Sequence, residues 1–118
     1  MPLVDRWGPP SFPRGLDLEI VQFSGNITVT DDMRDAIMQC TDGSGVTVTL
    51  PRDAPVGRFV FFEQGGAGQI TFAAASGGTL VNRLSYTATA GQYALVSVFV
   101  RSNSNGHSAV WALNGDAA

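Results

Sequence analysis

Short stretches of alternating hydrophobic and polar residues dominate the chain after residue 17. In VTVTLP (46–51), valine and leucine occupy every second position and threonine lies between them, which is the period of a strand with one buried face. Turn signals rich in glycine recur about every 8–12 residues. The pattern predicts an all-β domain over residues 18–118, and we expect an antiparallel β-sandwich of the jelly-roll type. The expected strands are LEIVQF, NITVT, AIMQC, VTVTL, RFVFFEQ, GQITFAA, TLVNRLSYTAT, QYALVSVFVRS and SAVWALNG; DDMRDAIM is the one candidate helix, with Asp31 or Asp32 as its N-cap.

Two of these stretches, RFVFFEQ (58–64) and QYALVSVFV (92–100), are apolar on both faces. Phe59 and Phe61 would point to one side of the first strand, and the residues between them are also apolar. A sandwich strand with one side in water would be polar on that side. We therefore expect the second side to be covered, either by another subunit or by the N-terminal part of the chain.

Residues 1–17 differ from the rest and predict an extended, proline-rich arm. They contain four of the six prolines, and proline has no N–H to donate to a sheet or a helix. The arm also carries large apolar residues that are spaced too widely to pack on one another, so they must pack on the chain's own sheet or on a neighbouring subunit. These residues are Leu3, Val4, Trp7 and Phe12, accompanied by Arg6 and Arg14.

The charge pattern excludes some classes of partner. Only 14% of the residues are charged, the net charge is −3, and the arginines are scattered without a basic cluster, so we expect no nucleic-acid binding. No stretch has the roughly 20 apolar residues that span a bilayer, and the N-terminus lacks a signal-peptide pattern, so we expect no membrane contact and synthesis in the cytoplasm. Cys40, the one cysteine, excludes an intrachain disulfide and is expected to be a buried thiol.

Reactive groups are scarce, and we expect no enzyme activity, no catalytic residue, no cofactor and no metal site. His107, the one histidine, lies in a polar loop between the last two expected strands, and we expect it to be an exposed loop residue with no catalytic role. The acidic cluster of Asp31, Asp32 and Asp35 fits no EF-hand spacing, and Arg34 lies within it. The stretches GGAG and SGG lack the lysine of a phosphate-binding loop and are expected to be hairpin turns with positive φ.

Carbohydrate binding is a further possibility, because an aromatic platform beside polar loop residues is typical of lectin sites. Trp111, Tyr86 and the loop RSNSNGH (101–107) offer these groups. However, Trp111 lies in the alternating stretch VWAL (110–113), and we expect its ring to belong to the core.

Three motifs in order carry a resemblance to a known class of protein. They are VTVTLP (46–51), Gln64-Gly65 followed by GAGQITF (66–72), and Trp111 followed by Asn114-Gly115-Asp116. Together they resemble a β-rich module that recurs in virion proteins of tailed bacteriophages, over residues 26–116. Relatives occur as head decoration (cement) proteins and as modules of tail fibres and spikes, usually as homotrimers. The motifs are structural, so the resemblance implies no catalytic residues.

The resemblance and the arm together predict a capsid decoration protein of the virion, bound to the outside of the head and to the major capsid protein. The capsid-binding residues would be those of the arm: Leu3, Val4, Arg6, Trp7, Phe12 and Arg14. The homotrimer interface would use Phe59, Phe61, Val98 and Val100. The alternative is a tail-fibre or receptor-binding module that recognises glycans on the host surface.

Overall fold

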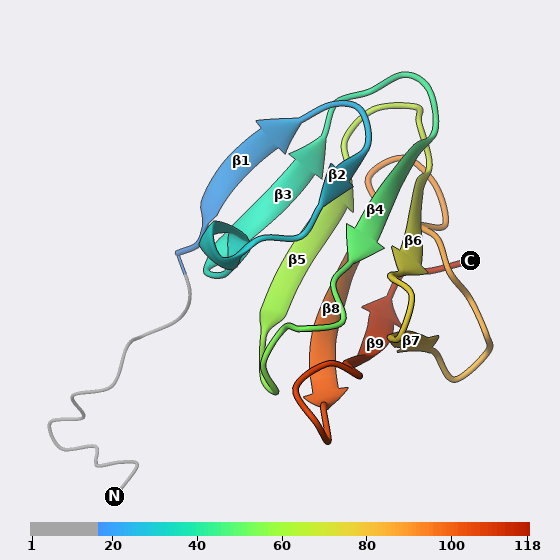
Figure 1. The fold of residues 1–118 in the computed structure, drawn as a ribbon. Coiled ribbons are helices and arrows are strands. Elements are labelled where there is room, and N and C mark those ends of the chain that lie inside the picture. Colours follow the sequence, from blue (N-terminus) through green and yellow to red (C-terminus); the bar gives the residue numbers. More distant parts are fainter. Residues whose placement is uncertain (1–16) are drawn as a thin grey trace, which may run out of the picture.

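The computed structural model describes residues 17–118, which form two facing β-sheets with one short 3-10 turn (Figure 1). The arm residues predicted to bind the capsid, Leu3, Val4, Arg6, Trp7, Phe12 and Arg14, lie outside the described residues. The elements are β1 (Glu19–Phe23), β2 (Ile27–Thr28), η1 (Asp31–Met33), β3 (Ala36–Cys40), β4 (Val46–Leu50), β5 (Phe59–Gln64), β6 (Ile70–Ala74), β7 (Thr79–Val81), β8 (Leu95–Ser102) and β9 (Val110–Gly115).

From β1 to β6 the chain alternates between the two sheets. The larger sheet has the strand order β1-β3-β5-β8-β9-β7, and the smaller sheet has the order β2-β4-β6. Each return to a sheet therefore passes through a strand of the other sheet, which supplies the crossover that a parallel pair needs. As a result β1–β3, β3–β5, β2–β4 and β4–β6 are all parallel, and the chain makes three turns of a flattened coil, as in a β-solenoid.

The all-β expectation is confirmed, but the antiparallel pairing is wrong for most strands, and the jelly-roll arrangement is not confirmed. Among the paired strands of residues 17–118, only β5–β8 and β8–β9 are antiparallel, and β7–β9 adds a fifth parallel pair. A glycine-rich turn signal marks where a strand ends, but it does not show whether the chain folds back in the same sheet or crosses to the other. That choice decides between antiparallel and parallel pairing.

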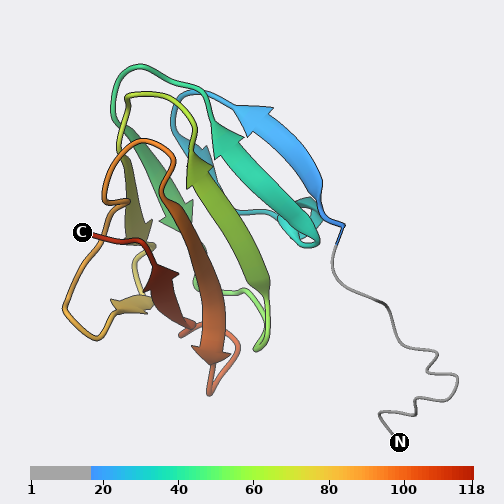
Figure 2. The same cartoon turned by 180° about the vertical axis from the view of Figure 1, so that it is seen from behind.

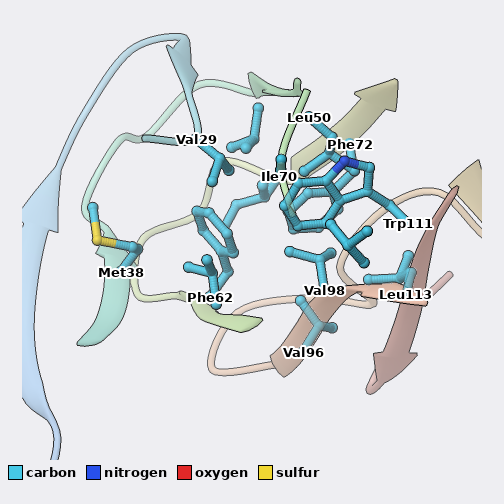
Figure 3. Close-up of a cluster of buried hydrophobic side chains, with 14 of the residues drawn as sticks. Val29, Met38, Leu50, Phe62, Ile70, Phe72, Val96, Val98, Trp111 and Leu113 are labelled. Atoms are coloured by element: carbon cyan, nitrogen blue, oxygen red, sulfur yellow. The ribbon is translucent and has the colours of Figure 1, made fainter. Parts of the chain in front are cut away.

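The hydrophobic core lies between the two sheets (Figure 3). The strand β4 follows its sequence pattern, with Val46, Val48 and Leu50 buried and the two threonines between them half-buried. Trp111 and Cys40 are fully buried, as predicted, and Trp111 Nε1 donates to the backbone oxygen of Pro51 at 2.9 Å. This hydrogen bond satisfies the one polar atom of the largest core side chain.

The corners of the coil stack directly on one another, which explains the glycines of the GGAG stretch. The amides of Gly65 and Gly66 donate to Cys40 O at 2.8 and 2.9 Å, and that of Gly68 donates to Asp42 O at 2.9 Å. A Cβ atom on Gly68 would lie 2.0 Å from Ser44 O, so no larger residue fits without a shift of the backbone. None of these three glycines has a positive φ. The expected hairpin turn is therefore wrong, and close approach of two backbone corners is what requires glycine.

The expected helix in DDMRDAIM is reduced to the single turn η1, with Thr30 rather than an aspartate at the N-cap position. The strand β3 begins at Ala36 and takes the second half of this stretch. The alternation of Ala36, Met38 and Cys40 toward the core favours a strand there, since a helix would not keep these residues on one face.

Candidate functional site

The outer face of the larger sheet is the main candidate for an interaction surface (Figure 2). Its inner face is covered by the smaller sheet, whereas no other described element covers the outer face. The strand register aligns outward side chains in rows across the sheet. One row contains Ile20, Ile37 and Phe61. A second row contains Phe59, Phe99, Ala112 and Val81.

Three phenylalanines form the centre of this outer face. The rings of Phe59 and Phe99 are stacked with centroids 5.7 Å apart, and the rings of Phe59 and Phe61 lie 5.1 Å apart. Phe59 is 41% exposed, and Ile20 in the neighbouring row is 58% exposed. Contiguous exposed apolar side chains of this size are typical of a surface that another molecule covers.

The predicted trimer interface is only partly compatible with this face. Phe59 and Phe61 point outward, but Val98 and Val100 are buried in the core, where Figure 3 shows Val98. Their placement in the interface is therefore wrong, because alternate residues of a strand point to opposite faces and Val98 lies opposite the inward Val60. The residues that do accompany the phenylalanines, Ile20 and Ile37, were missed because only the parallel register of β1 with β3 brings them there.

A polar row borders the apolar rows on the same face. Gln22 Nε2 donates to Gln39 Oε1 at 3.0 Å, and Gln39 Nε2 donates to Glu63 Oε1 at 2.7 Å. A shallow hollow beside this row is also lined by Tyr93, whose side chain is 73% exposed. Tyr93 has a φ of 72°, which costs energy for a residue with a side chain, and its amide donates to Gln64 O at 2.6 Å. No sequence signal indicated this conformation.

The residues expected for carbohydrate binding do not form a platform in this fold. The ring of Trp111 is buried, as its alternating stretch predicted, so it offers no surface to a sugar. The polar loop beside it is fastened to the loop after β4, because Asn103 Nδ2 donates to Arg52 O at 3.1 Å and to Ala54 O at 3.0 Å. Tyr86 is partly exposed in a turn whose backbone is held by Asn82 Oδ1.

His107 lies in the same loop, and its Nδ1 lies 2.8 Å from Asp53 Oδ1. Both side chains are mostly exposed, and the hydroxyl of the adjacent Ser108 donates to Asn105 Oδ1 rather than to the imidazole. The pair joins two loops at one end of the sandwich.

The acidic cluster near η1 is also occupied by protein contacts, since Arg58 Nη1 lies 2.9 Å from Asp31 Oδ1. Over residues 17–118, no three histidine, cysteine or acidic side chains gather in a way that could hold a metal ion.

Asp42 links two corners of the coil through its carboxylate. Its Oδ1 accepts from the amide of Ser44 and its Oδ2 from the amide of Gly25, each at 2.9 Å. These hydrogen bonds, chiefly that of Ser44 and then that of Gly25, lower the pKa of the Asp42 carboxyl below its ordinary value. The carboxylate therefore holds successive turns of the coil in register.

Gln64, which belongs to the resemblance motif, has a structural task in the core. The Thr89 hydroxyl donates to Gln64 Oε1 at 2.6 Å and accepts from the amide of Ile70 at 3.0 Å. Gln64 Nε2 lies 3.3 Å from the backbone oxygens of Gly66 and Ala67. The pair of buried side chains thus fixes the corner between β5 and β6, and nothing in the sequence indicated Thr89.

In the described part of the chain, no helix combines the length and the apolar character that crossing a bilayer requires. Comparison with known proteins adds no relative, because no protein-family model, no curated protein and no solved structure matches this chain.

Proposed function

We propose that this protein is a non-enzymatic structural protein of a tailed-bacteriophage virion, a decoration protein that binds the outside of the head and stabilises contacts between major capsid subunits. The class of virion protein comes from the resemblance of the three motifs. The observation that favours an assembling protein is the outer face of the larger sheet, with Phe59, Phe61 and Ile20 at its surface. We propose that three copies meet through this face.

The size of the outer face suits a contact that needs help from other parts of the chain. Six strands about 4.8 Å apart and about 17 Å long cover roughly 400 Å² in projection. A standard protein interface buries about 800 Å² on each partner. The sheet face alone is therefore smaller than a standard interface, and the apolar residues proposed for the arm, Trp7 and Phe12 among them, would supply separate contacts to the shell in the assembled particle.

With many copies on one particle, weak contacts between individual copies would be sufficient for strong overall binding to the shell. When neighbouring copies are held on the same shell, each further contact forms at a high effective concentration, so weak interfaces add to strong overall binding. Burial of apolar side chains supplies about 25 cal/mol for each Å² removed from water, before the cost of ordering is subtracted.

The proposed self-association is tested with the double variant Phe59→Ser/Phe61→Ser. Both side chains are on the outer face, so the variant should fold and elute as a smaller species in size-exclusion chromatography with light scattering. Leu84→Ser is the matched control, because Leu84 is 51% exposed in the turn after β7 and belongs to no strand of this face. A wild-type protein that is monomeric at every concentration, or a double variant that assembles like the control, would contradict the proposed interface.

The proposed location is tested by cryo-electron microscopy of the particle. A decoration protein should be present in many copies over the head. A few copies at the tail, with none on the head, would reject the decoration role.

The hollow beside Tyr93 favours one alternative, a tail-fibre-type module that binds host-surface glycans. An exposed aromatic ring can stack on a sugar, and the row of Gln22, Gln39 and Glu63 presents planar polar groups next to it. On this alternative, Tyr93→Ala should abolish binding on a glycan array while Tyr86→Ala should not. Failure of the wild-type protein to retain any glycan would reject it.

A further inference from the structure

The outer face of the larger sheet is hollowed next to the point where the N-terminal residues join the fold. Leu18, Asp35, Phe59 and Phe61 line this hollow. A second hollow continues from it, since both share Asp35 and Phe59, and it extends along residues 55–58. The first hollow, which is mainly apolar, thus begins at Leu18, one residue after the first described position, and the second is more polar, with Arg34 and Arg58 in its lining.

The segment before Asp17 has the length and chemistry to fill the apolar hollow. Its 16 residues would span about 50 Å if extended at about 3.1 Å per residue, while the six strands span only about 24 Å. Phe12 precedes Leu18 by six residues, which allows a reach of at most about 20 Å. Proline-rich extended chain is well suited to aromatic-lined grooves, because it loses little entropy on binding. Arg14 carries the charge opposite to that of Asp35, which lines the hollow.

We propose that residues 1–16 of each chain cover the outer face of that same chain's larger sheet, with Phe12 against Phe59 and Phe61, and that assembly displaces them. The tether favours the chain's own arm, since a segment attached at Leu18 is present at an effective concentration in the millimolar range. A second copy must compete from bulk solution at a much lower concentration. The arm then protects an apolar face that would otherwise be exposed in the unassembled protein.

This inference rests on the proposed function, because the face that the arm covers is the face proposed for self-association. The arm and a second copy cannot occupy Phe59 and Phe61 together. Displacement on the particle would make the face available to the neighbouring copy and the arm available to the shell in a single exchange.

Trp7 provides a direct test in the full-length protein. The chain has two tryptophans, and Trp111 is buried in the core, so the difference between the wild type and Trp7→Phe isolates the emission of Trp7. We expect Trp7 to be protected from acrylamide quenching at least about threefold relative to the urea-unfolded protein. Phe12→Ala and Phe59→Ala/Phe61→Ala should each at least double its quenching constant, while the control Leu84→Ala should leave it unchanged. Trp7 that is as accessible in the folded wild type as in urea, or insensitive to both sets of changes, would overturn the proposal.

Dilution separates the chain's own arm from that of a neighbour. Protection by the chain's own arm should be retained or should increase over a hundredfold dilution, and protection that disappears with dissociation of the oligomer would overturn the assignment. The two proposals fail differently. Self-association through Phe59 and Phe61 with Trp7 fully accessible also in the dissociated protein rejects the arm docking alone, and protected Trp7 in a protein that never self-associates rejects the interface alone and supports the docking.

Discussion

The two faces of the larger sheet are built from the same strands, yet they have different surroundings. On β5, Val60 and Phe62 face the smaller sheet and are buried, while Phe59 and Phe61 face outward and remain partly exposed. The side chains on both faces are of similar size and chemistry. The inner face is covered by the smaller sheet, and no described element covers the outer face.

This difference shows that apolar character alone does not identify the core. A strand with one wet face would carry polar residues there, so apolar residues on both faces indicate two covering layers. The smaller sheet is one of these layers. Residues 1–16 and another copy of the chain are the proposed second layer, because no described element covers the outer face.

The two faces should differ most in their response to the removal of one aromatic ring. Phe62→Ala should lower the free energy of unfolding by about 3–5 kcal/mol, because the ring packs edge-to-face on Phe72, with centroids 5.2 Å apart, and would leave a cavity. Phe61→Ala should cost less than about 1.5 kcal/mol, because its ring is only partly withdrawn from water. Urea denaturation followed by circular dichroism measures both. Equal losses would mean that the outer face is packed as fully as the core.

Weakening the corner that holds the smaller sheet over the inner face should make that face less well covered, and so more like the outer face. In Gly68→Ala the new methyl group would meet Ser44 O and Asp42 O. We therefore expect the free energy of unfolding to fall by about 2–3 kcal/mol. Gly43→Ala is the matched control, since nothing lies within 4 Å of a Cβ there, and it should change stability by less than about 0.5 kcal/mol. Thermal unfolding measures the pair. A neutral Gly68→Ala would contradict the stacked corners.

A smaller effect is expected from the polar contact that anchors the same corner. Thr89→Val keeps the shape of the side chain but leaves Gln64 Oε1 and the amide of Ile70 without their partner, at a cost of about 1–2 kcal/mol. Thr49→Val on the half-buried side of β4 serves as the control and should cost less. Hydrogen exchange of the Ile70 amide should also accelerate in the first variant. Unchanged exchange would show that Thr89 does not fix the corner.

The smallest and most specific effect concerns Asp42. Its pKa is lowered in the folded state, so its carboxylate stabilises the fold above the unfolded pKa of about 3.9, and this contribution is lost as the pH falls through the lower folded pKa. Asp42→Asn should therefore be less stable than the wild type at pH 7, and the difference should shrink at pH 2.5. Urea midpoints at several pH values measure it. A difference of equal size at both pH values would show that charge is not involved.

The sequence predicts the strands well and their pairing poorly. Alternation identifies β4 and β5 and the inward direction of Val48 and Phe62, because side-chain period is a local property. Pairing depends on whether a turn closes a hairpin or crosses between sheets, and this is decided by contacts between corners distant in sequence, such as Gly68 with Asp42. The sequence shows that this corner is rich in glycine. It does not show that the close approach of two backbone corners, and not a positive φ, is what requires glycine there.

The same limit applies to the outer face. Its aromatic centre at Phe59 and Phe61 follows from the sequence, because apolar residues occupy both faces of one strand. Val98 and Val100 were assigned to the wrong side because the register between β5 and β8 was unknown. Ile20 and Tyr93 reach this face through a parallel register and an unusual backbone angle, and neither leaves a local signal.

The buried thiol of Cys40 is a natural probe for transient opening of the coil. It is the one thiol in the chain, it is fully buried, and its backbone oxygen accepts hydrogen bonds from the corner at Gly65 and Gly66. A thiol reagent can reach it only when that corner separates from the one beneath. The rate of labelling therefore measures transient opening of the coil, and it can be followed in solution with the unmodified protein.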